Sequence, residues 1–286
     1  MARWQDVAQA IRQGIASGEY PPGSVIPKET ELMHIHGVGR ETIRRAVAQL
    51  TAEGLIEPVR RRGTVVRPRP ARHRITRSRQ VYRDELGYYF DQTAQSWRPL
   101  QPPSVSRGPV PYDIAGLLGL DPGTEVIIRD RIMGDPATGQ PTQLATSYIP
   151  ATLAAELPVL AGPDTGPGGI YDRMEQAGHG PIQWTEAITA RMPGPDEARQ
   201  LKLPPGVPLL RILRLAATPA GRPLEVNDTR ANAEQWEISY PITRHRSARL
   251  RHGQRPLSRI EPGTELLVTR PASRSPDRPQ LVQRPS

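Results

Sequence analysis

The chain has 286 residues, no cysteine and a formal net charge of +9. This length predicts two domains plus a tail, and the lack of cysteine excludes disulfides and thiolate metal sites. The amphipathic N-terminus is unlike a signal peptide, and no apolar run reaches the roughly 18 residues of a membrane helix. We therefore expect a cytoplasmic protein with no membrane partner.

Charge is spread unevenly along the chain. Residues 1–80 have a net charge of +8, residues 81–243 a net charge of −6, and residues 244–286 a net charge of +7. We call the basic N-terminal part the head and the acidic central part the body. This distribution of charge indicates a module that binds a polyanion, joined to a domain with a different partner. A proteome that uses arginine as its default surface charge would explain the tail, but it explains the head less well.

Three helices are predicted in the first part of the chain, each with apolar side chains three or four residues apart. The first covers residues 4–17. The second begins near Pro27, where proline suits a first helical turn. The third runs from Arg40 to Glu53, and Gly54 ends it.

A charged hairpin is predicted directly after the third helix. Leu55–Glu57 and Thr64–Val66 are β-prone, and the stretch between them ends in Arg60–Gly63, a tip of charge and glycine. Three helices followed by a basic hairpin predict a winged helix-turn-helix over residues 1–68.

The rest of the chain divides into a basic linker at 69–80, a body at 81–243 and a tail at 244–286. In the body, strands and helices mix without strict alternation, which favours an α+β domain. The arginine- and proline-rich tail is expected to be largely disordered. The predicted strands of the body are 125–132, 186–191 and 209–215, and its predicted helices are 170–176 and 195–203.

The third helix carries the chemistry expected of DNA recognition. Its 100° step turns Glu41, Arg44 and Arg45 away from the apolar stripe. A helix fits the major groove, and an arginine fork can bind guanine O6 and N7. The wing arginines suit phosphates or a narrow minor groove. The alternative is that Arg44 and Arg45 only solvate an exposed face.

Several motifs of this head occur in a known order and spacing. They are Pro22-Gly23, Ile26-Pro27-Lys28-Glu29, Val38-Gly39-Arg40-Glu41-Thr42-Ile43-Arg44, Glu53-Gly54-Leu55-Ile56 and Gly63-Thr64-Val65-Val66. With them, the segment Gly23–Val66 resembles the DNA-binding domain of the GntR family of bacterial regulators. The resemblance implies DNA contacts from Arg40, Arg44 and the region of Arg62. The full set of expected DNA-binding residues is Lys28, Arg40, Glu41, Thr42, Arg44, Arg45, Arg61, Arg62 and Gly63.

A second group of motifs follows in the body. They include Arg129-Asp130-Arg131, the segment 141–150, Gly169-Ile170-Tyr171-Asp172, Gly221-Arg222-Pro223-Leu224-Glu225 and Trp236-Glu237-Ile238-Ser239-Tyr240. Through these, residues from about 80 to 243 resemble the UTRA effector domain of the HutC-type branch of the same family. That resemblance implies a chorismate-lyase-like α+β fold that binds a small effector, often an anionic one.

The expected effector-binding residues are Arg129, Arg131, Thr146, Tyr171 and Glu225. Arg129 and Arg131 lie two apart on a predicted strand, so both point to one face, where two guanidinium forks can hold a phosphate or a carboxylate. Tyr171 and Glu225 match positions that line the pocket in the family. Buried ion pairs would explain Arg129, Arg131 and Glu225 without a ligand.

Together these features predict a homodimeric repressor that binds double-stranded DNA at an inverted repeat and responds to a small effector. No cofactor or metal is expected, since the pair His34 and His36 lacks a third ligand. Two alternatives stay open. One is a constitutive plasmid or mobile-element repressor, because Ala145 and Gly169 depart from the usual pocket pattern. The other is a lyase-like enzyme fused to a DNA-binding head.

Overall fold

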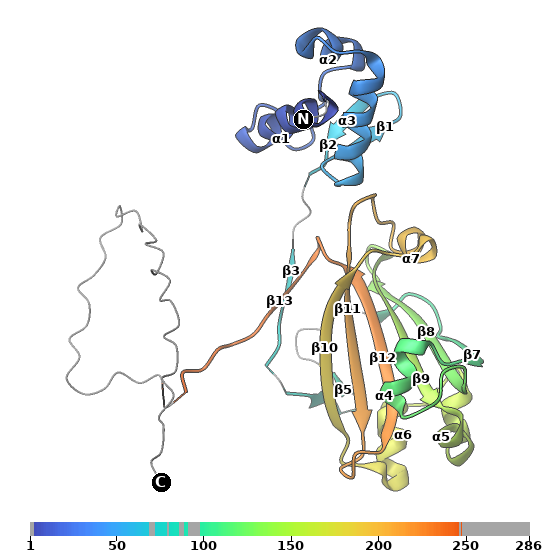
Figure 1. The fold of residues 1–286 in the computed structure, drawn as a ribbon. Helices are drawn as coiled ribbons and strands as arrows, with labels where there is room; N and C mark the ends of the chain where they lie inside the picture. Colours follow the sequence, from blue (N-terminus) through green and yellow to red (C-terminus); the bar gives the residue numbers. More distant parts are fainter. Residues whose placement is uncertain are drawn as a thin grey trace, which may run out of the picture. The chain divides into compact units, whose positions relative to one another are not determined.

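The computed structural model describes residues 3–68, 72–78, 80–85, 89–90, 98–245 and 247. Its first elements are three helices and a two-stranded hairpin (Figure 1). The helices are α1 (Arg3–Ser17), α2 (Glu29–His36) and α3 (Arg40–Ala52), and the strands are β1 (Ile56–Val59) and β2 (Gly63–Val66). The winged helix-turn-helix predicted from the sequence is confirmed in its element order.

One apolar core holds these elements together. Ile11 of α1, Leu32 of α2 and Leu50 of α3 are almost completely buried and belong to a single cluster. Ile56 and Val66 of the hairpin complete it. Because α1 and α3 bury apolar residues three or four apart, their opposite faces are left to solvent, whereas α2 buries Leu32 alone.

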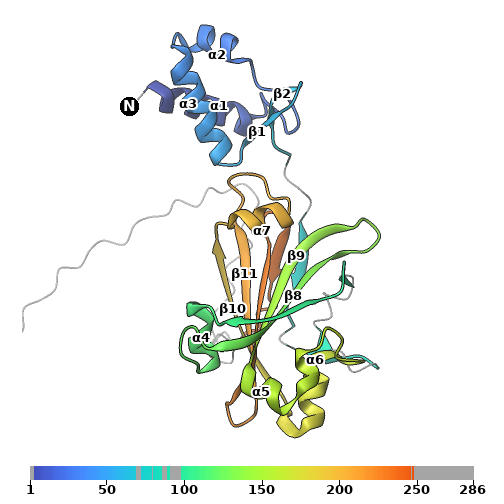
Figure 2. The same ribbon diagram turned by 90° about the vertical axis from the view of Figure 1, so that its right-hand side faces the viewer.

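The body is built on a seven-stranded antiparallel sheet with the order β10-β11-β12-β9-β8-β6, in which β7 also pairs with β8. Figures 1 and 2 show this sheet from two directions. Only part of this sheet is predicted from the sequence, since β9 and β12 were recognised as motifs rather than as strands. The strands are β6 (Arg98–Pro99), β7 (Ser104–Pro109), β8 (Glu125–Asp135), β9 (Gln140–Pro150), β10 (Gln183–Arg191), β11 (Leu209–Ala217) and β12 (Pro223–Asn232).

Helices cover both faces of this sheet. One face packs on α5 (Ala151–Glu156) and α6 (Gly169–Met174), with Ile127, Ile149 and Ala216 in the shared core. The other face packs on α4 (Tyr112–Leu118). We call the first the α6 face and the second the α4 face. The predicted helix 195–203 is shorter in the structure, where α7 covers Pro195–Gln200.

The segment predicted to be a basic linker contains a strand. Within residues 69–80, β3 (His73–Thr76) pairs in parallel with β13 (Trp236–Ser239). The reason is Ile75, which is 4% exposed and packs with Ala231 and Trp236 in a small cluster. Ile75 therefore anchors a strand in a segment whose composition is that of a linker, and the pairs Arg74–Glu237 and Thr76–Ser239 add polar contacts.

The remaining elements are short. A two-stranded ribbon joins β4 (Tyr82–Arg83) to β5 (Tyr89–Phe90), and a turn of helix follows α5 at Pro158–Ala161. The α6 helix continues into a π-helical turn at Glu175–His179. The tail predicted to be disordered lies almost wholly outside the described residues. Within the described residues, no helix is long and apolar enough to span a membrane.

Candidate DNA-binding surface and effector site

The outer face of α3 is a row of charged side chains. Arg40, Glu41, Arg44 and Arg45 are exposed, whereas Thr42 is half-buried. Gly39 precedes the helix in an extended conformation and caps it without a side-chain bond. The helix therefore presents three exposed guanidinium groups, which suits a helix that enters the major groove.

Arg40 is held by an acidic residue of the preceding helix. Its Nε donates to Glu29 Oε2 at 2.9 Å, while its side chain stays 73% exposed. The bond uses only Nε, and the described residues offer no partner to the two Nη groups. Glu29 therefore restricts the rotamers of Arg40 and leaves its two Nη groups available for a bidentate contact with a ligand.

We expect Glu29→Gln to weaken DNA binding about two- to fivefold, the size of an exposed charge pair. The variant removes the charge that orients Arg40 and also removes a negative charge near DNA, and these effects oppose each other. Fluorescence anisotropy of operator DNA measures the net result. A gain in affinity would mean that Glu29 acts only through repulsion.

Arg45 and Arg44 differ in their surroundings. The Arg45 guanidinium lies 5.2 Å from the centroid of the Trp4 ring on α1, within cation–π range. Arg44 is exposed and has no such contact among the described residues. Arg45 is therefore partly fixed against the head itself, and Arg44 is the less restrained of the two.

The wing is a hairpin of β1 and β2 with arginines at its tip. Arg61 has a positive φ of 65°, and Gly63 follows with φ of 108°, where a side chain would be strained. Arg62 Nη2 donates to the Gly23 carbonyl at 2.7 Å, which ties the tip to the turn before α2. All of these side chains are exposed, as is Lys28 at the start of α2.

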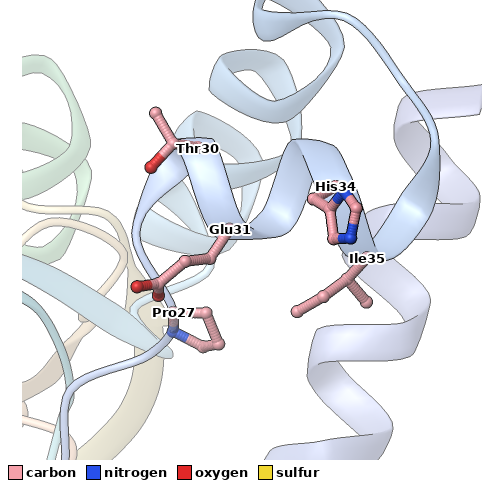
Figure 3. A pocket seen from close by; sticks show the side chains of 5 residues that line it. All are labelled: Pro27, Thr30, Glu31, His34 and Ile35. Atoms are coloured by element: carbon pink, nitrogen blue, oxygen red, sulfur yellow. The ribbon is translucent and has the colours of Figure 1, made fainter.

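A hollow of about 510 Å³ lies on the surface of α2. Figure 3 shows the side chains that line it. Its lining is Pro27, Thr30, Glu31, His34 and Ile35. Ile35 is 59% exposed although its side chain is apolar. The helix has only eight residues, so its apolar set is narrow and Leu32 alone is buried.

Arg129 lies on the α6 face but is occupied by the protein's own backbone. Its side chain donates to the carbonyls of Leu160, Gly162 and Pro163. The residue is 5% exposed, and burial together with the neighbouring Arg131 charge lowers the pKa of Arg129. Arg129 therefore holds the loop after α5 in place. We expect a direct contact with an effector from Arg131 rather than from Arg129.

Arg131 lies on the same face and is less occupied. Its Nη2 donates to Ser147 Oγ at 2.7 Å, and Ser147 also accepts a bond from Asn227 Nδ2 at 3.1 Å. The Nε of Arg131 is buried and has no hydrogen-bond partner among the described residues. A buried donor without an acceptor costs free energy, which makes it a candidate ligand contact.

Tyr171 of α6 and Glu225 of β12 form a buried pair. The Tyr171 hydroxyl donates to Glu225 Oε2 at 2.8 Å, and Glu225 is fully buried. Its other oxygen, Oε1, is buried without a hydrogen-bond partner among the described residues. Burial raises the pKa of Glu225 above its usual range, opposed by nearby hydroxyls and by the charges of Arg131 and Arg214.

Thr146 is placed apart from the other expected effector residues. Strand register pairs Arg129 with Ser147 and Asp130 with Thr146, so Thr146 lies on the α4 face. There its hydroxyl bonds Asp130 and Arg230. The structure therefore brings Arg129, Arg131, Tyr171 and Glu225 to one face and does not bring Thr146 with them.

Two residues that the sequence analysis did not select complete the α6 face. Glu186 of β10 lies directly opposite Arg214 of β11, and its Oε1 accepts bonds from Arg214 Nε at 2.9 Å and Nη2 at 2.6 Å. Their signal in the sequence is weak, since each is one charge within an alternating strand. Only the register between the strands pairs them.

Family models match both halves of the chain. Residues 4–66 match the model for bacterial regulatory proteins of the gntR family, and residues 104–237 match the UTRA domain. The matched segments fall within the head and the body predicted from the sequence.

Known relatives cover most of the chain. An HTH-type transcriptional regulator of Streptomyces coelicolor is 30% identical over 234 residues, which are 78% of this chain and 86% of the relative. One of Mycobacterium tuberculosis is 30% identical over 241 residues, covering 83% and 85% of the two chains. A crystal structure described as a GntR-family transcriptional regulator is 27% identical, with a TM-score of 0.61, and covers 86% of this chain and 99% of its own.

Proposed function

Since this chain belongs to the GntR family of bacterial regulatory proteins, with a UTRA domain after its DNA-binding head, we propose that it is a homodimeric repressor. Each α3 helix enters the major groove at one half of an inverted-repeat operator, because a two-fold dimer matches a palindromic site. A small effector bound in the body weakens this complex.

The observation that carries the DNA-binding part is the division of α3 into two faces. Ile43, Ala46 and Leu50 are buried completely, while the arginines of the same helix are exposed. Arginines that served only solubility would not need the fixed positions given by Glu29 and Trp4. Positioned guanidinium groups on an exposed helix favour specific recognition over general attraction to a polyanion.

The test is fluorescence anisotropy of the full chain on DNA from its own promoter region, at several salt concentrations. We expect saturable binding in the nanomolar range to an inverted repeat, with affinity that falls steeply as salt rises. Scrambling one half-site separates a dimer on two half-sites from a monomer on one. Weak binding that is equal for all sequences would contradict the proposal.

Two buried polar atoms on the α6 face support a proposal for the class of ligand. Arg131 Nε is a buried donor without an acceptor, and Glu225 Oε1 is a buried acceptor without a donor, among the described residues. We propose an effector that carries an oxyanion for Arg131 and a hydroxyl or amine for Glu225. The relatives matched are transcriptional regulators, so we propose binding without turnover.

We expect Glu225→Gln to raise the thermal stability of the protein more at pH 8 than at pH 5. A carboxyl whose pKa is raised by folding contributes stability below its unfolded pKa and loses it as pH rises through the folded pKa. Glutamine keeps an acceptor for Tyr171 and does not titrate. Thermal melting at both pH values measures the difference, and an equal gain at both would contradict a raised pKa.

A further inference from the structure

The segment that follows the DNA-binding head is part of the body's structure. In the ladder between β3 and β13, Ile75 pairs with Ile238. The backbone N–H of Arg77 then donates to the Ser239 carbonyl at 2.8 Å. A change in the contacts of β3 is therefore expected to affect the segment that connects β3 to the head.

The side chain of Arg77 extends from the end of β3 to the sheet. It is 11% exposed, and its Nη2 lies 3.6 Å from Glu186 Oε1. That oxygen is the one that accepts both bonds from Arg214. One carboxylate oxygen thus serves two guanidinium groups, one from the linker strand and one from the sheet.

Arg214 connects this carboxylate with the effector site. In the sheet it pairs with Asn227, which bonds Ser147, and Ser147 bonds Arg131. Its positive charge is also close enough to lower the pKa of Glu225. Glu186 and Arg214 therefore stand between the proposed ligand position and β3.

We infer that Glu186 couples occupancy of the effector site to the linker strand. The inference rests on the proposed function and concerns its regulation. An oxyanion beside Arg131 attracts Arg214 and repels Glu186, because like charges in a partly buried site interact strongly. Glu186 then moves away from both arginines, and Arg77 loses a contact that helps to hold β3. The effector favours this released state by its greater affinity for it.

The test is hydrogen exchange of the full chain, read at the amides of residues 73–77. Glu186→Gln removes the negative charge without an effector, so we expect exchange there to become about tenfold faster, as local opening gets easier. Arg214→Gln leaves Glu186 to Arg77 alone, so exchange should stay equal or slow down. Glu125→Gln breaks the exposed pair with Arg107 and serves as the matched control, with no change at β3.

Unchanged exchange in Glu186→Gln would overturn the inference, as would equal acceleration in Glu186→Gln and Arg214→Gln, which indicates general loosening of the sheet. The proposed function is judged separately, by operator binding of the unaltered protein in the same preparation. If that protein binds its operator and β3 does not respond to Glu186, only the coupling fails.

Discussion

Replacing Arg40 with alanine is expected to lower DNA affinity by about 1–3 kcal/mol, roughly 5- to 160-fold, and to relax base preference at the position that Arg40 contacts. The guanidinium of Arg40 is exposed and oriented by Glu29. Its loss removes a bidentate contact and leaves the Glu29 carboxylate unpaired beside the DNA. Fluorescence anisotropy on the operator and on single-base variants measures both effects.

Three further variants separate the causes. Arg107→Ala removes another exposed arginine, on β7, so it controls for net charge and should leave affinity nearly unchanged. Arg40→Lys keeps the charge without the planar fork and should restore only part of the affinity. Adding Glu29→Gln to Arg40→Ala should recover the part that comes from repulsion. Wild-type affinity in Arg40→Ala would mean that α3 is not the recognition helix.

Replacing Leu50 with alanine is expected to destabilise the head by about 2–5 kcal/mol and to abolish specific DNA binding at moderate temperature. Leu50 is completely buried in the last part of α3, within the core shared with Ile11 and Ile56. A domain of this size has about 0.05–0.15 kcal/mol of stability per residue, so the loss is a large share of the total.

Calorimetry and hydrogen exchange over residues 3–66 measure the stability of the head and so test this prediction. A fall of about 10 °C or more in the melting temperature of the head is expected from the usual shift per kcal/mol in a small domain. Leu117→Ala is the matched control, because Leu117 of α4 is 38% exposed and its truncation leaves no cavity. An unchanged head in Leu50→Ala would mean that its core repacks around the missing side chain.

The structure also distinguishes two of the expected effector-binding residues. Arg129 and Arg131 were equal candidates in the sequence, two residues apart on one strand. Arg129 donates hydrogen bonds to three backbone carbonyls. Arg131, by contrast, has a buried Nε without an acceptor within the described part of the chain. Arg131→Gln is thus the more informative variant for a ligand screen.

The head, the α+β character of the body and the shared face of Arg129 and Arg131 were predictable from the residues alone. These follow from local rules, since helical spacing and strand alternation are set by the backbone over a few residues. Pairing between distant strands instead places Thr146 on the other face, brings Glu186 to Arg214 and makes β3 a strand. Those outcomes depend on the register and pairing of strands far apart in the chain, and no local pattern encodes which partner a side chain meets.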